Sequence, residues 1–252
     1  MKKTSFAFRL LPLLSVLILT SCSNKESHPE SEGWVSLFNG INLSGWEFKV
    51  DEAKSIWSVI DGVIDCEPNL KMKGDKSLWS TKSYYDFTLH VEWRLKELKG
   101  IYNLPTVLPD GSYQLDADGE KVINPGPGAD SGIYVRGTNK AQINIWNWAI
   151  GSGEVYSYRN NQKDPVIRAG VTPKVNADNP IGEWNTFIIT MKGDRLTVDL
   201  NGKRVLDNAQ LPGVPESGPV VLQHHGGYNH ETKEWSGASS LVQFRNLHIK
   251  EL

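Results

Sequence analysis

Residues 87–94 read Phe87-Thr88-Leu89-His90-Val91-Glu92-Trp93-Arg94, with apolar and polar side chains in strict alternation. Successive side chains of a β-strand point to opposite faces, so this order predicts a strand with one apolar and one polar face. The apolar face would pack into a core. The polar face, which carries Glu92 and Arg94, would point the other way.

Similar short runs extend in both directions along the chain, separated by Gly, Asn, Asp and Pro. We expect strands at 56–60, 63–66, 132–136, 141–146, 186–191, 196–200, 220–223 and 241–252. Asp61-Gly62 and Asn201-Gly202 each lie between two apolar runs, which is typical of a tight hairpin turn. No long amphipathic helix is evident, and residues 96–124 suggest an insertion with its own small hairpin.

This succession of strands predicts an all-β fold, either two packed antiparallel sheets or a barrel. In a β-sandwich each sheet buries one face against the other. The chain is long enough for one large β domain, which we place at residues 34–252.

The N-terminal segment has the layout of a secretory signal peptide. Lys2, Lys3 and Arg9 precede an apolar stretch at 10–19 that is too short to span a bilayer. Residues 19–22, Leu-Thr-Ser-Cys, resemble the bacterial lipobox, in which cleavage precedes a cysteine that is then lipidated. We therefore expect a signal peptide at 1–21 and a lipid anchor at Cys22. An ordinary signal peptide with a chance cysteine is the alternative.

The polar residues 22–33 would form a flexible tether between the lipid and the domain, because they contain too little apolar surface to fold. The expected location is the cell envelope, on the bacterial outer membrane, the cell surface or facing the periplasm. The formal charge of -2 gives no broad basic surface, so we expect no nucleic-acid partner. With Cys22 assigned to the lipid, Cys66 has no disulfide partner. The nine Trp and eight Tyr residues hint at carbohydrate binding.

Strand alternation brings a set of polar side chains to what we expect to be one surface. An acid, two guanidinium groups, amides, an indole and an imidazole together suit a polyhydroxylated ligand. The opposing interpretation is that each is a solvated residue on the outer face of a sandwich. The predicted floor comprises Glu92, Arg94, Arg136, Gln142, Asn144, Trp146, Gln223 and His225.

His224 and His225 are adjacent, so on a strand their side chains point apart and cannot easily share one metal ion. We favour His225 as the functional residue, because an imidazole is a natural proton shuttle near neutral pH. One buried and one exposed histidine is the simpler alternative. No HExxH, CxxC, Walker or GxGxxG spacing and no nucleophile elbow occurs in the sequence.

Several segments together resemble one family, the 3-keto-disaccharide hydrolase domain family, over roughly residues 34–252. They are Gly33 to Gly40 with Leu43 to Trp46, Asp86 to Arg94, Ser131 to Gly137, Gly182 to Asn185, Leu200 to Gly202, Leu222 to Gly226, and Phe244 to Lys250. The resemblance implies a concanavalin-like jelly roll of two antiparallel sheets. It also implies glycoside substrates whose C3 hydroxyl has been oxidised to a ketone.

Such a ketone acidifies the proton at C2, so a base can remove it and the group at C1 can leave by β-elimination, after which water can add back. The resemblance implies that His225 is the base at C2 or the acid for the leaving group. Arg136 and Gln142 would stabilise the enolate oxygen, and Glu92 would orient an arginine or act as the second acid/base. Trp146 would stack on the sugar. The remaining predicted substrate contacts are Arg94, Asn144, Tyr134, Gln223, Glu154 and His224.

The segment at 141–146 departs from the family pattern, because many members end it with an acidic residue where this chain has Trp146. Glu154 follows shortly and would supply that charge. A divalent metal could replace the arginine as electrophile, but the sequence gives no firm ligand set. A non-catalytic glycan-binding lipoprotein on the same scaffold is the main alternative. A two-carboxylate glucanase is weaker, because the ExDxxE-type strand motif is absent from the sequence.

Overall fold

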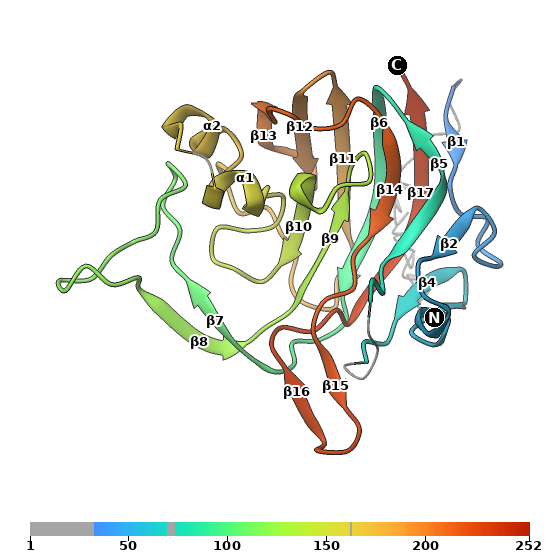
Figure 1. Cartoon of the computed structure of the whole chain (residues 1–252), viewed down its shortest axis with the longest axis horizontal. Coiled ribbons are helices and arrows are strands. Elements are labelled where there is room, and N and C mark those ends of the chain that lie inside the picture. The colour runs from blue at the N-terminus through green and yellow to red at the C-terminus, as the bar shows by residue number, and fades with distance from the viewer. Residues whose placement is uncertain (1–32, 70–73, 162) are drawn as a thin grey trace, which may run out of the picture.

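A computed structural model describes residues 33–69, 74–161 and 163–252. The predicted signal peptide, Cys22 and all of the tether except Gly33 lie outside the described residues. Two antiparallel sheets make up most of the described chain, and they stack face to face (Figure 1). The structure is therefore the all-β, two-sheet antiparallel sandwich of the concanavalin-like jelly roll that the sequence predicts.

The larger sheet has eight strands. Their order is β13 (Lys203–Gln210), β12 (Arg195–Leu200), β11 (Asn185–Lys192), β6 (Phe87–Leu95), β17 (Val242–Glu251), β4 (Val63–Cys66) and β3 (Trp57–Ile60), with β1 (Val35–Ser36) paired to β17. The smaller sheet has five strands in the order β10 (Gln142–Trp146), β9 (Asp130–Tyr134), β14 (Gly218–Leu222), β5 (Leu78–Tyr84) and β2 (Trp46–Phe48). Neighbours along the chain are often separated in the sheets, as in β6, which lies between β11 and β17.

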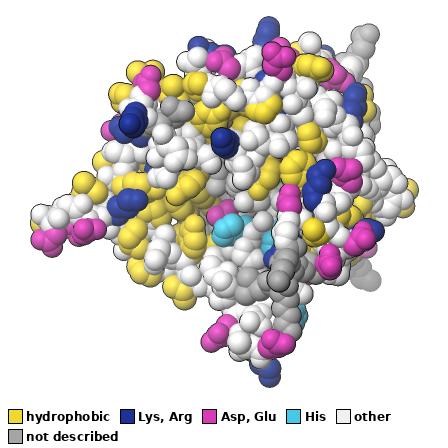
Figure 2. Space-filling view, viewed as in Figure 1, with side chains coloured by type: hydrophobic (Ala, Val, Ile, Leu, Met, Phe, Trp, Pro, Cys, Tyr) yellow, Lys and Arg dark blue, Asp and Glu magenta, His cyan; other side chains and the backbone are white. Residues whose placement is uncertain are grey.

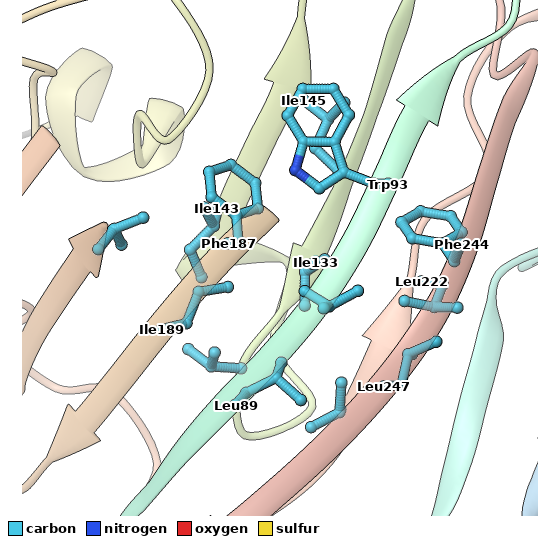
Figure 3. Packing of buried hydrophobic residues seen from close by; sticks show 14 of the residues in the cluster. Leu89, Trp93, Ile133, Ile143, Ile145, Phe187, Ile189, Leu222, Phe244 and Leu247 are labelled. Carbon is cyan, nitrogen blue, oxygen red and sulfur yellow. The ribbon is translucent and has the colours of Figure 1, made fainter. Parts of the chain in front are cut away.

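The core lies between the two sheets. The apolar residues of β6 are buried there, whereas Thr88, His90 and Arg94 alternate with them and are only partly buried. Trp93 and Leu89 from the larger sheet meet isoleucines of β9 and β10 from the smaller one (Figure 3). Burying one such side chain contributes roughly 1.5–3 kcal/mol, so this interlayer contact is the main source of stability.

Both predicted hairpin turns are present. Asp61 and Gly62 join β3 to β4 with φ of 50° and 77°, and Asn201 and Gly202 join β12 to β13 with φ of 50° and 75°. Two consecutive residues with positive φ form a type I′ turn, whose twist matches that of the flanking strands. Asn, Asp and Gly adopt this conformation at the lowest cost.

The insertion after β6 forms the predicted extra hairpin. Its strands β7 (Ile101–Pro105) and β8 (Ile123–Pro127) make a long arm at the left of Figure 1. The arm packs on Trp146 and Trp148 through Tyr102, Leu104 and Val107, which gives a second small core outside the sandwich. The arm therefore stands beside the outer face of β10.

The remaining elements are short. They are the helices α1 (Tyr156–Asn161) and α2 (Pro165–Gly170), the 3₁₀ turns Asp51–Ser55 and Asn139–Ala141, and the hairpin of β15 (Gly227–Asn229) and β16 (Glu234–Ser236). None of the helices in the described part of the chain is long and apolar enough to cross a bilayer. Cys66 is a free, buried cysteine in β4.

Candidate active site

The outer face of the smaller sheet carries most of the predicted polar residues. In the β9–β10 pair, Asp130 lies opposite Trp146, Gly132 opposite Asn144, and Tyr134 opposite Gln142. Directly opposed residues of antiparallel strands share a face, so these side chains all point away from the core. The isoleucines between them point into it.

Four of them, Asp130, Gln142, Asn144 and Trp146, line a cavity of about 200 Å³. Figure 2 shows a histidine next to an acidic side chain in a hollow at the centre of this face, with hydrophobic side chains along one border. The sequence predicted Gln142, Asn144, Trp146, Gln223 and His225 at one surface, and the structure brings these five together. The other lining residues are Tyr102, Asp130, Tyr156 and Ser157.

Gln142 lies flat across β9 because residue 132 is a glycine. A Cβ on Gly132 would stand 2.6 Å from the Gln142 Nε2 atom, which is closer than side chains tolerate. The Gln142 amide donates to Gln223 Oε1 at 2.7 Å and to the Ser131 carbonyl at 3.3 Å. Both amide hydrogens are thus used within the protein, and Gln142 offers a ligand its carbonyl oxygen.

Asn144 offers the same kind of group. With its amide oriented to satisfy both polar atoms, its NH₂ donates to the carbonyls of Gln142 at 3.3 Å and Glu154 at 3.2 Å. The side-chain oxygen has two lone pairs, so it can still accept from a ligand. Two neighbouring amide acceptors on a cavity floor suit hydroxyl groups, which donate as well as accept hydrogen bonds.

His225 is held in one tautomer. Its Nδ1 lies 3.0 Å from the Ala238 carbonyl oxygen, which can only accept, so Nδ1 carries the hydrogen. Neutral His225 therefore has its free lone pair on Nε2, where it can accept a proton. Ser240 fixes the backbone here, because its hydroxyl accepts from the His225 N–H at 2.5 Å and donates to the Asp130 carbonyl at 2.7 Å.

Asp130 stands behind this imidazole, with its Oδ2 3.9 Å from His225 Nδ1. The carboxyl is almost fully buried, and its Oδ1 has no hydrogen-bond partner among the described residues. Burial raises the pKa of Asp130 to about 6, although the nearby His225 acts in the opposite direction. At neutral pH Asp130 is mostly ionised and can stabilise a positive charge on His225.

Two phenols flank this pair. Tyr102 comes from β7 and Tyr156 from α1, so both belong to segments outside the sandwich. Burial is the main reason that the pKa of each phenol is raised to about 12. Both hydroxyls therefore keep their protons at neutral pH. The Tyr156 hydroxyl is hydrogen-bonded to Tyr113, so Tyr102 is the phenol that can donate into the cavity.

Trp146 forms one wall, and only part of it is available. Its ring stacks on Trp148 with centroids 3.9 Å apart and planes 2° from parallel, while Tyr156 contacts both rings edge-on. Its indole N–H donates to the Gly151 carbonyl at 2.8 Å. A sugar could use only the face of Trp146 that is turned away from Trp148.

The prediction that Glu92 and Arg94 share this floor is wrong. Both lie on β6 in the larger sheet, whose outer face points away from that of the smaller sheet. Glu92 accepts from Arg245 and Asn246, each at 2.6 Å. The Arg94 Nε donates to Gln243 at 2.6 Å. Alternation tells which residues face away from the core, but it cannot tell to which sheet a strand belongs.

Arg136 is also elsewhere, because its strand ends at Tyr134. Arg136 has a φ of 53° and Gly137 a φ of 66°, so the chain turns and the period of two is lost. The buried guanidinium donates to the carbonyls of Tyr85, Gly193 and Pro215 and pairs with Asp86 at 2.8 Å. It joins separate loops and does not line the cavity.

Tyr134, His224 and Glu154 were predicted to contact the substrate, and none of them lines the cavity. Tyr134 shares the correct face, but it is buried within hydrogen-bonding reach of Ser77 and Gln223, and burial raises its pKa to about 12. His224 points to the opposite side from His225.

Burial, with smaller effects of Lys76 and His225, lowers the pKa of His224 to about 3, so its imidazole is neutral. Glu154 is fully buried in an ion pair with Arg159, so its charge is compensated before it could serve the cavity.

Metal-ligand chemistry in the cavity is limited to Asp130 and His225. The described ranges contain no group of three or more His, Cys, Asp and Glu side chains that could hold a metal ion. The divalent metal considered from the sequence thus has no complete ligand set among these residues.

Four cavity residues were missed by sequence reasoning. Asp130 could have been found, since it continues the alternation of Gly132 and Tyr134 just ahead of the strand predicted at 132–136. Tyr102, Tyr156 and Ser157 could not, because they come from the arm and from α1, where no strand period applies. Only the packing of the arm and of α1 against β10 brings them to the cavity.

Comparison with known proteins gives one family and several solved structures. The family model of the 3-keto-alpha-glucoside-1,2-lyase-like domain matches residues 33–250. The chain is similar to a predicted glycosyl hydrolase from Parabacteroides distasonis, at 19% identity and a TM-score of 0.55, over 88% of this chain and 84% of that one. A second structure from that organism, also a predicted glycosyl hydrolase, gives 18% identity, a TM-score of 0.50, and 87% and 94% coverage. These similarities support the sandwich fold. No curated protein matches the chain.

Proposed function

Because this chain belongs to the family of 3-keto-α-glucoside-1,2-lyase-like domains, we propose that it cleaves 3-keto-glycosides by removing the C2 proton and eliminating the group at C1. The sequence resemblance predicted this family, and the match to the family model confirms it. Membership identifies the chain as a carbohydrate-active protein. The observation that carries the finer proposal is the His225–Asp130 pair on the floor of a polar cavity.

The first step is proton abstraction. The ketone at C3 acidifies the C2 proton, and the free Nε2 of His225 takes that proton. The electrons of the C–H bond move into the C2–C3 bond, and the ketone oxygen becomes an enolate. His225 becomes an imidazolium whose charge the Asp130 carboxylate stabilises from 3.9 Å.

The enolate oxygen needs hydrogen-bond donors. We assign this role to the hydroxyl of Tyr102, which remains protonated and lines the same cavity as His225. This assignment replaces the roles first given to Arg136, which lies elsewhere, and to the Gln142 amide, whose hydrogens are already used. Gln142 and Asn144 would instead accept from sugar hydroxyls.

The second step is elimination. The enolate reforms the ketone, a double bond forms between C1 and C2, and the C1–O bond breaks. The imidazolium of His225 returns its proton to the departing oxygen, so the base is ready for another cycle. Addition of water across the double bond would then release the 3-keto sugar, which makes the overall outcome a hydrolysis.

Incubation of the purified protein with a 3-keto-glucoside and, in parallel, with the unoxidised glucoside tests the proposal. We expect turnover of the ketone alone, with absorbance from the conjugated enone or release of the 3-keto sugar. In D₂O, reversible abstraction would place deuterium at C2. His225→Ala should lose this exchange while keeping the melting temperature.

The other outcomes are equally informative. Exchange at C2 at wild-type rates in His225→Ala would remove this residue from the chemistry. Binding without turnover would favour a non-catalytic glycan-binding protein. Cleavage of the unoxidised glucoside would contradict the ketone-dependent mechanism and favour an ordinary glycosidase.

A further inference from the structure

Arg159 is a buried arginine that lies beside the cavity without lining it. It belongs to α1, only 2% of it is exposed, and its guanidinium pairs with the buried carboxylate of Glu154. The same guanidinium donates to the Gly111 carbonyl at 3.3 Å and to the Tyr113 hydroxyl at 3.1 Å. Both acceptors lie between β7 and β8, so this one side chain joins α1 to the arm.

The contact of Arg159 with Gly111 is part of a clamp on one turn of the arm. Residues 108–112 form this turn, in which the Gly111 N–H donates to the Leu108 carbonyl at 2.8 Å. Three consecutive carbonyls of the turn each accept from a different cationic side chain. The pairs are Lys174 to Pro109 at 3.3 Å, Arg168 to Asp110 at 3.2 Å, and Arg159 to Gly111 at 3.3 Å. Charged donors bind carbonyls more strongly than neutral ones, so the three together hold the turn in place.

The turn also fits closely against α2 and the segment that follows it. Gly111 has a φ of 80°, and a Cβ there would stand 2.5 Å from the Thr172 hydroxyl oxygen and 2.9 Å from the Arg168 carbonyl oxygen. Only a glycine permits this approach. The docked position of the arm is therefore a specific fit of this sequence.

The partners of Arg159 connect it to the floor and to the wall of the cavity. The Glu154 carbonyl accepts from the Asn144 N–H at 2.9 Å, so the ion pair stands behind the floor. The centre of the Tyr156 ring lies 5.3 Å from the guanidinium carbon, and the Tyr156 hydroxyl is hydrogen-bonded to Tyr113. Floor, wall and arm thus meet at one guanidinium outside the cavity lining.

We propose that Arg159 is a positioning residue for the reaction at His225, because it holds the arm, and with it Tyr102, at the cavity. β7 leads from Tyr102 to the clamped turn, so freeing the turn lets this strand shift relative to the floor. The positioning role rests on the proposed function, whereas the docking of the arm by Arg159 does not depend on it.

Arg159→Lys tests the docking without any turnover. Its ammonium can still pair with Glu154, but it lacks the planar fork that reaches Gly111 and Tyr113 together. Amide hydrogen exchange in the β7–β8 peptides, followed by mass spectrometry, should become about 10–100-fold faster, as expected for the loss of a charged hydrogen bond. Exchange in β6 should stay at the wild-type rate. Wild-type exchange in the arm, or equally faster exchange in β6, would refute docking by Arg159.

Two further variants complete the exchange experiment. Arg136→Lys is the matched control, because Arg136 is also a buried arginine that donates to loop carbonyls, but it lies away from the cavity. It should leave exchange in the arm unchanged. Tyr113→Phe removes the hydroxyl that accepts from Arg159, and it should speed exchange in the arm even if Arg159→Lys does not fold. Faster arm exchange in Arg136→Lys, or none in Tyr113→Phe, would contradict the docking.

Turnover of a 3-keto-glucoside tests the positioning role. Arg159→Lys should lower kcat about tenfold and change KM less than about threefold, because Tyr102 acts in the transition state while the floor amides that hold the sugar stay in place. Arg136→Lys should keep both wild-type values. A wild-type kcat in Arg159→Lys, or a rise in KM alone, would refute the positioning role. If wild-type protein turns over no ketone, the proposed function fails, while hydrogen exchange still decides the docking.

Discussion

Replacement of Asp130 by Asn should make the protein more stable and less active at neutral pH. Asp130 is buried, one of its oxygens has no partner in the described part of the chain, and burial raises its pKa from 3.8 to about 6. A carboxyl whose pKa is higher in the folded state binds its proton more tightly when folded. Protonated Asp130 therefore contributes its full stability to the folded state below about pH 4. This contribution is lost as the pH rises through about 6.

The magnitude follows from the pKa. One pKa unit corresponds to about 1.4 kcal/mol, so ionised Asp130 destabilises the folded state at neutral pH by up to about 3 kcal/mol. The amide introduced by Asp130→Asn carries no charge and avoids this cost. Activity should fall, because the imidazolium formed at His225 loses the carboxylate 3.9 Å away.

Urea unfolding of wild type and Asp130→Asn at about pH 3.5 and about pH 7.5 measures the effect. The variant should exceed wild type by up to about 3 kcal/mol at the higher pH and match it at the lower pH. The same difference at both pH values would mean that ionisation of Asp130 is not its cause. A variant that is less stable at pH 7.5 would refute the reasoning.

Three further changes have separate outcomes. Gly132→Ala should lower the free energy of unfolding by about 2–4 kcal/mol in urea titrations, since the new methyl group displaces the Gln142 side chain and its two hydrogen bonds; unchanged stability would show that Gln142 adapts. Arg136→Met should cost about 1.5–3 kcal/mol by the same measurement, because the carbonyls of Gly193 and Pro215 lose their charged donor, and an unaltered unfolding midpoint would contradict that role. We also propose, from the sequence alone, that Cys22→Ala moves the protein from the membrane to the soluble fraction; retention in the membrane would exclude Cys22 as the anchor.

Asp130 and His225 give the site an arrangement that lowers the stability of the fold. A buried carboxyl with one oxygen unpaired among the described residues destabilises the fold, which does not require it. Active sites commonly retain such features at the expense of stability. The better-satisfied buried pairs of the chain, such as Arg136 with Asp86, are the structural ones.

Local pattern predicted much of this protein correctly, for a physical reason. Side-chain alternation and Asx-Gly turns are properties of a single strand or hairpin, so they can be read from neighbouring residues. The strand at 87–94 buries its apolar set, both type I′ turns are present, and Gln142, Asn144 and Trp146 share one polar face. The resemblance to a family depends on the same local segments and holds over residues 33–250.

Only the tertiary structure decided which polar faces meet. Glu92 and Gln142 both lie on outward-facing sides of strands, yet they belong to different sheets and face opposite directions. Tyr102 and Tyr156 join His225 only because the arm and α1 fold over β10. Alternation fixes a side chain relative to its own sheet, whereas the position of one sheet relative to another depends on contacts between residues far apart in the sequence.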